Sequence, residues 1–136
     1  MKILFPGTNA FLEIDVLSYE HPNSTNWLSC TLLCKIDRLE VREVLSLETH
    51  DFVELQKSII AFNQHTSDVV EFATIEEQLQ FTIQRESKFV KIKGKISSFP
   101  PTQGIFIFEF EAEALAFSTI EALENIVLNF PIVQEY

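Results

Sequence analysis

Hydrophobic and polar residues alternate strictly along four stretches of the chain, a pattern typical of half-buried β-strands. These stretches cover residues 28–36, 78–84, 90–96 and 106–113. Weaker alternation predicts three further strands, over residues 11–17, 39–47 and 69–74. Because each stretch has one apolar and one polar face, we expect an antiparallel sheet that is covered on one side.

Two other segments repeat their apolar residues every three or four positions, which is the spacing of an amphipathic helix. The first runs from Thr49 to Asn63, with Thr49 as the expected N-cap and Asp51 in the first turn, where a carboxylate suits the helix dipole. The second runs over residues 118–130 and opens with the sequence Ser-Thr-Ile-Glu, which has the form of a capping box. The sequence therefore predicts two helices, each with its own N-terminal signal.

The predicted elements follow the order strands, helix, strands, helix within 136 residues, the usual size of one domain. The chain has only three glycines and no linker-like stretch. We therefore expect a single α+β domain over residues 1–136. Its predicted architecture is one antiparallel sheet of about six or seven strands, with both helices packed on one face in a two-layer arrangement.

The polar faces of the last two strong strands carry opposite charges. Lysines occupy positions 91, 93 and 95, and glutamates occupy positions 109, 111 and 113. If residues 97–104 form a hairpin loop, the two rows lie opposite each other, and each pair contributes roughly 0.2–1 kcal/mol, less in salt. We interpret the lysines as structural partners of the glutamates rather than as a phosphate-binding site.

Acidic residues outnumber basic ones by 20 to 10, which gives a formal charge of −10. This balance argues against binding of nucleic acid or of an anionic membrane, because both require a basic surface. It favours a basic protein partner, which the charge would attract over distance. The alternative is that the charge only keeps the protein soluble.

The chain has the features of a protein of the reducing cytoplasm. It contains no apolar run of roughly 18 residues that would span a bilayer, and its first residues lack a secretory signal. Cys30 and Cys34 fall on one face of a predicted strand about 13 Å apart, which is too far for a disulfide. We expect both to be buried thiols.

The sequence offers little catalytic chemistry. His21, His50 and His65 are far apart and lie in no metal-ligand spacing. Glu76 and Glu77 form a carboxylate pair of the kind used in glycoside hydrolysis, but solvated surface acids fit the pattern better. We expect a protein that is not an enzyme and that uses no metal and no cofactor.

Acidic residues concentrate in the two segments that contain the helices. Residues 40–77 carry nine acids and two bases, and residues 109–136 carry six acids and no base. A helix surface with acids, an amide and an exposed leucine suits a basic protein partner. The expected partner-binding residues are Asp51, Glu54, Glu121, Glu124, Asn125 and Leu128. A merely solvated acidic face is the alternative interpretation.

Several short sequences follow one another along the chain. They are Tyr19-Glu20-His21-Pro22-Asn23, Asn26-Trp27-Leu28, Glu54-Leu55, Ile60-Ala61-Phe62, a Leu-x-Phe-x-Ile strand at 79–83, Val90-Lys91-Ile92-Lys93-Gly94, a Phe-x-Phe-x-Phe strand at 106–110, and Phe130-Pro131. In this order the chain resembles the WapI family of bacterial immunity proteins over nearly its whole length. The resemblance implies a non-enzymatic cytoplasmic protein that sequesters a toxin, in that family a nuclease acting on RNA.

Two other functions remain open at this point. The chain has the composition of a general interaction module with an unidentified partner. It also has 13 phenylalanines, some of which could line a small-molecule pocket between the sheet and the helices. An exposed edge strand would allow a dimer, so the sequence leaves both a monomer and a dimer possible.

Overall fold

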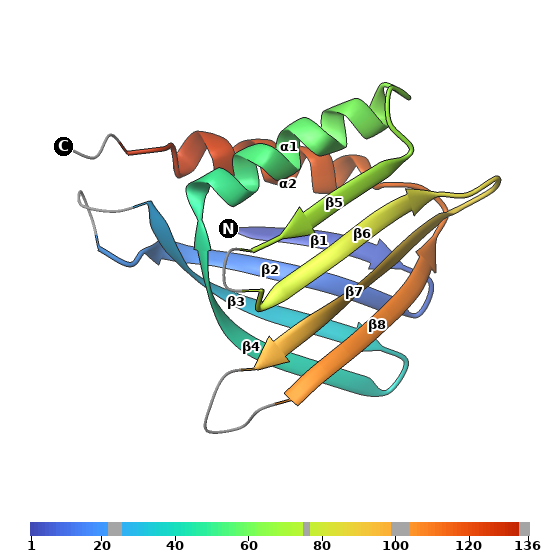
Figure 1. Ribbon diagram of the computed structural model, residues 1–136, viewed down its shortest axis with the longest axis horizontal. Coiled ribbons are helices and arrows are strands. Elements are labelled where there is room, and N and C mark those ends of the chain that lie inside the picture. The colour runs from blue at the N-terminus through green and yellow to red at the C-terminus, as the bar shows by residue number, and fades with distance from the viewer. Residues whose placement is uncertain (22–25, 75–76, 99–103, 134–136) are drawn as a thin grey trace.

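A computed structural model describes residues 1–21, 26–74, 77–98 and 104–133 of the chain. Eight strands and two helices make up the fold, and Figure 1 shows their arrangement. In chain order they are β1 (Lys2–Gly7), β2 (Ala10–Tyr19), β3 (Trp27–Ile36), β4 (Leu39–Glu48), α1 (Thr49–Asn63), β5 (Val69–Ala73), β6 (Leu79–Arg85), β7 (Val90–Ser98), β8 (Gly104–Ala112) and α2 (Phe117–Asn129). The predicted α+β class, the antiparallel pairing and the two helices are confirmed.

The strands form two separate four-stranded sheets, so the prediction of one sheet with six or seven strands is wrong. One sheet has the order β1-β2-β3-β4, and the other has the order β5-β6-β7-β8. Each sheet pairs only strands that are neighbours in the sequence, and α1 carries the chain from the first sheet to the second. β1 was not predicted from the sequence, because its apolar alternation is limited to Ile3 and Phe5 before Pro6 and Gly7 interrupt it.

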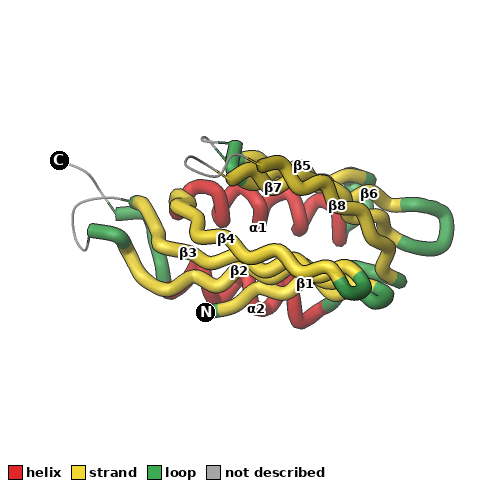
Figure 2. Tube along the Cα trace, turned by 90° about the horizontal axis from the view of Figure 1, so that it is seen from below, coloured by secondary structure: helices red, strands yellow, loops and turns green. Residues whose placement is uncertain are grey.

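The two sheets pack face to face and bury their apolar sides against each other (Figure 2). The rings of Phe5 in the first sheet and Phe81 in the second meet edge to face, with centroids 5.3 Å apart. Phe81 also stacks on Phe72 of the neighbouring strand at 4.9 Å. Aromatic pairs of this kind add to the burial of apolar area, so this cluster fixes how the two sheets are placed.

The helices do not cover one face of a sheet as expected, but lie together along one side of the two-sheet sandwich (Figure 1). α1 packs beside β5, α2 packs beside β1, and the two helices contact each other. The hydroxyl of Thr119 on α2 donates a hydrogen bond to the backbone carbonyl of Leu4 on β1. Together the helices close the gap between the edges of the two sheets.

Both helix starts differ in detail from the prediction. The N-cap of α1 is Glu48 instead of Thr49, and the backbone N–H of Glu48 donates to the carboxylate of Asp51 at 2.8 Å in a capping box. The predicted capping box of α2 is wrong, because that helix begins one residue earlier, after Ala116, with no side-chain cap. Thr119, a residue of the expected box, instead ties the helix to β1.

The far end of α1 is held by a side chain of the second sheet. Arg85 on β6 donates to the backbone carbonyl of Phe62, and its guanidinium lies 4.0 Å from the centre of the Phe62 ring. Its Nε also lies 3.3 Å from the carboxylate of Asp68. A cation at a helix C-terminus is favourable, and the last turn of α1 has no basic residue of its own. Arg85 therefore fastens α1 to the second sheet.

The predicted register of the lysine and glutamate rows is confirmed at two of three positions, but no ion pair within 4.0 Å joins the two rows among the described residues. Lys91 lies opposite Glu111 and Lys93 lies opposite Glu109 on the outer face of the second sheet. Lys95 instead lies opposite Ile107, because the register of the hairpin places position 113 beyond the end of β8. Most of the predicted hairpin loop, residues 99–103, lies outside the described residues.

Gly94 lies in the row of the second sheet that holds the large aromatic residues. It pairs with Phe81 on one side and with Phe108 on the other. A Cβ atom at position 94 would lie 2.1 Å from the carbonyl oxygen of Gln80 and 2.7 Å from the Cβ of Phe81. Only glycine therefore allows the strands to approach this closely.

We predict that Gly94→Ala lowers the free energy of unfolding by about 1–3 kcal/mol, the usual cost of overpacking. The matched control is Gly104→Ala, because a Cβ at position 104 would only make an ordinary contact with Ser98 Oγ at 3.5 Å. Urea denaturation followed by circular dichroism measures both variants. Equal stability of the two variants would contradict the packing role of Gly94.

Candidate partner-binding surface

Four of the six residues predicted to bind a partner lie on one side of α2. Glu121, Glu124, Asn125 and Leu128 are exposed, and their spacing of three or four positions places them along one stripe of the helix. The opposite stripe, formed by Thr119, Leu123 and Ile126, is buried against the rest of the protein. The structure thus brings these four predicted residues together on one surface.

Phe117, which was not predicted from the sequence, extends the same surface toward the start of the helix. Its side chain is 75% exposed and lies one turn before Glu121, while Leu128 at the other end is 68% exposed. The signal was the helix boundary, because a helix that begins at Phe117 places this residue in the stripe. We refer to Phe117, Glu121, Glu124, Asn125 and Leu128 as the α2 face.

The α2 face is acidic and carries no internal countercharge. Within the described part of the chain, no basic side chain lies within 4.0 Å of the carboxylates of Glu121 or Glu124. The helix itself contains no lysine or arginine. Both carboxylates are therefore available to a cationic partner, and an exposed apolar side chain stands at each end of the acidic stretch.

The two predicted residues of α1 have other partners. The carboxylate of Asp51 is half-buried and closes the capping box with Glu48, and burial raises its pKa while the hydrogen bond from Glu48 opposes this rise. Glu54 is exposed and forms an ion pair with Lys57 at 3.2 Å. The structure does not bring these two side chains into the α2 face.

Tyr19, at the end of β2, and Asn26, just before β3, hold the segment after α2 in place. Asn26 donates to the backbone carbonyl of Val133 at 3.1 Å and accepts from the N–H of the same residue at 2.5 Å. The hydroxyl of Tyr19 donates to the carbonyl of Pro131 at 2.6 Å, and its ring contacts Phe130 with centroids 5.5 Å apart. These side chains are structural ties that fix the segment after α2.

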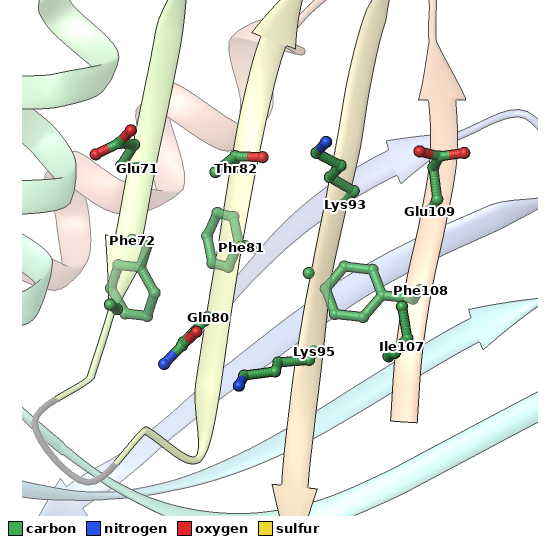
Figure 3. Close-up of a pocket in the computed structure, with 12 residues that line it drawn as sticks. Glu71, Phe72, Gln80, Phe81, Thr82, Lys93, Lys95, Ile107, Phe108 and Glu109 are labelled. Atoms are coloured by element: carbon green, nitrogen blue, oxygen red, sulfur yellow. The ribbon is translucent and has the colours of Figure 1, made fainter. Parts of the chain in front are cut away.

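A shallow hollow of about 610 Å³ crosses the outer face of the second sheet (Figure 3). One row across it runs from Glu71 through Thr82 and Lys93 to Glu109, with one residue from each strand. The hollow is open and does not lie between the sheet and the helices. A smaller hollow of about 390 Å³ lies where the end of α1 meets β6 and β7, and Phe62 and Phe89 are among its lining residues.

The side chains that could carry chemistry are either buried or dispersed. Cys30 and Cys34 are buried free thiols, as predicted. Burial raises the pKa of Cys30 to about 12 and that of Cys34 to about 11. Over the described residues, no group of three or more metal-binding side chains gathers closely enough to hold an ion. Neither described helix is long and apolar enough to cross a membrane.

The comparison with known families assigns the chain to one of them. The model of the family described as the immunity protein WapI-like family matches residues 3–131. The match includes both helices and reaches all eight strands, so the chain belongs to this family. No curated protein and no solved structure was found to match it.

We predict that neither thiol reacts with iodoacetamide in the native protein at about pH 8, because the thiolate is the reactive species and burial disfavours it. Both should be alkylated once the protein is unfolded in guanidinium. Mass spectrometry before and after unfolding counts the modified thiols. Rapid alkylation of the native protein would show that the interior around Cys30 and Cys34 opens readily.

Proposed function

We propose that this member of the WapI-like immunity family neutralises a toxin domain inside a bacterial cell by binding to it. The family match over residues 3–131 is the observation that carries the proposal. The toxin domain is proposed to be a basic protein, and a nuclease acting on RNA is the kind that the family resemblance suggests. Inhibition is proposed to occur in the cytoplasm, where both thiols stay reduced.

The charge of the protein supports a basic partner. A nuclease needs a basic cleft to hold the phosphate backbone of its substrate. A protein with a net charge of −10 is attracted to such a cleft, and the attraction raises the association rate. An inhibitor that covers the cleft needs no catalytic group of its own.

The α2 face is the surface that we propose for toxin binding. Its two free carboxylates can pair with basic side chains of the partner, and Asn125 can donate and accept hydrogen bonds. Phe117 and Leu128 provide apolar anchors at the ends, of the kind that contributes most to affinity. Asp51 and Glu54 are proposed to add to the acidic field without direct contact, because one closes a helix cap and the other pairs with Lys57.

We predict that Glu121→Lys and Glu124→Lys each weaken binding of the neighbouring-gene toxin domain by about tenfold or more at low salt, because each change replaces an attraction with a repulsion. The toxin domain is the one encoded beside this gene, used in catalytically inactive form. Isothermal titration calorimetry at low and moderate salt measures the affinity. The difference between variant and parent protein should shrink as salt screens the charges.

The matched control is Glu71→Lys, an identical charge change at an exposed position of β5 far along the chain from α2. This control should change the affinity less than either α2 variant. Tight binding that is indifferent to both α2 variants would keep the immunity function and move the contact away from α2. Absence of any binding to the neighbouring toxin domain would refute the proposed function.

A further inference from the structure

The four edge strands of the two sheets are protected to different degrees. The edge of β1 is covered by α2, whose Thr119 hydroxyl donates a hydrogen bond to the backbone carbonyl of Leu4. α1 runs along the edge of β5 (Figure 1). The edge strand β4 carries four charged residues, Glu40, Arg42, Glu43 and Glu48. Glu43 lies opposite the buried Leu32 and so faces the interior, and an inward charge at an edge deters pairing with another strand.

The first half of β8 has none of these protections. Residues 104–108 carry no charge, and the side chains of Ile105 and Ile107 are 67% and 77% exposed. β8 is the last strand of its sheet and, among the described residues, pairs only with β7 (Figure 3). A long apolar edge of this kind is a template for the addition of another strand.

The direction of the free backbone groups on β8 follows from two hydrogen bonds. The N–H of Thr8 donates to the carbonyl of Glu111 at 2.9 Å, so Glu111 points its backbone groups away from β7. Ser97 of β7 donates to Gln78 on the β6 side, which leaves the even-numbered residues of β7 to bond β8. Because the direction alternates along an antiparallel strand, Ile105, Ile107 and Glu109 point their N–H and C=O groups outward.

We propose that this free rim of β8, at Ile105, Ile107 and Glu109, accepts an extended strand of the toxin partner. The inference rests on the proposed function and adds a second contact, made through the backbone, to the α2 face. In an antiparallel addition, apolar side chains would lie beside the two isoleucines and a basic side chain beside Glu109. From its N-terminus, the recognised segment therefore reads basic, any residue, apolar, any residue, apolar.

A second copy of this chain fits the rim less well than a basic partner does. β8 contains no lysine or arginine, so no self-pairing places an opposite charge beside Glu109. Antiparallel self-pairing centred on Ile107 sets Ile105 of each copy against Glu109 of the other. Each copy also carries a charge of −10, which opposes association.

Amide hydrogen exchange measured by NMR tests the proposal residue by residue. The labelled protein is compared alone and with the inactive toxin domain encoded beside its gene. The N–H groups of Ile105, Ile107 and Glu109 should exchange at least about tenfold more slowly in the complex, because the added strand takes them up. Those of Phe106, Phe108 and Phe110 already bond β7 and should change less. Binding without this alternation would overturn strand addition and leave the immunity function standing.

Two variants at one position separate backbone pairing from side-chain contact. Ile107→Thr removes the apolar side chain and keeps the N–H group, whereas Ile107→Pro removes both, and an outward N–H is the kind that proline can replace on an edge strand. Ile107→Pro should weaken toxin binding at least about tenfold more than Ile107→Thr. The comparison is valid when the two variants have the same melting temperature. Equal losses would overturn the proposal, and if the proline variant fails to fold, the exchange pattern of the parent protein decides.

A short peptide probe keeps the test independent of the toxin. The probe is acetyl-Lys-Thr-Val-Thr-Val-amide, and its matched control has glutamate in place of lysine. If the lysine peptide slows the exchange of the three outward amides and the glutamate peptide does not, the rim of β8 accepts an extended basic strand. This conclusion would hold even if the neighbouring toxin domain does not bind. Equal effects of both peptides, or none, would overturn it. Slowed exchange in the free protein that grows with its concentration would identify a second copy as the occupant instead.

Discussion

The contact between the inner faces of the two sheets is the interaction on which the rest of the structure depends. Each sheet is a simple series of neighbouring strands with one apolar face, and the helices pack beside β1 and β5. The apolar faces leave water mainly by packing on each other, and the buried sides of the helices complete the same core. The cluster of Phe5, Phe72 and Phe81 forms across this interface, and Gly94 leaves room for it.

The helices have a different role in this arrangement. They lie along one side of the sandwich and cover the edges of β1 and β5, which joins the sheets where they would otherwise part. Arg85 and Thr119 connect each helix to one sheet by a bond to a backbone carbonyl. The outer surface of α2 is not needed for this role, so its exposed residues are free to differ without loss of the fold.

The sequence predicts the local elements well because local elements depend on periodicity. Seven strands and both helices lie where the alternation or the helical spacing indicated them. The division into two sheets was not predictable in this way, because alternation shows that a strand has a covered face and does not show what covers it. Both helix caps were predicted wrongly because each helix begins at a different residue than its local sequence suggested, α1 after Glu48 and α2 after Ala116.

The same limit applies to the candidate site. The residues Glu121, Glu124, Asn125 and Leu128 were found from helical spacing alone, and Phe117 was missed by a one-residue error in the helix start. The rim of β8 could not be found from the sequence, because an edge exists only once the strand order is known.

The bond between Thr119 and Leu4 spans 115 positions of the chain, and it has a consequence for when the protein becomes active. Joining such distant segments carries the entropy cost of closing a long loop, which slows folding. The bond can form only when both ends of the chain are present, so α2 cannot take its place on β1 while the chain is still being made. The surface proposed to bind the toxin is therefore complete only in a chain that has been synthesised to α2.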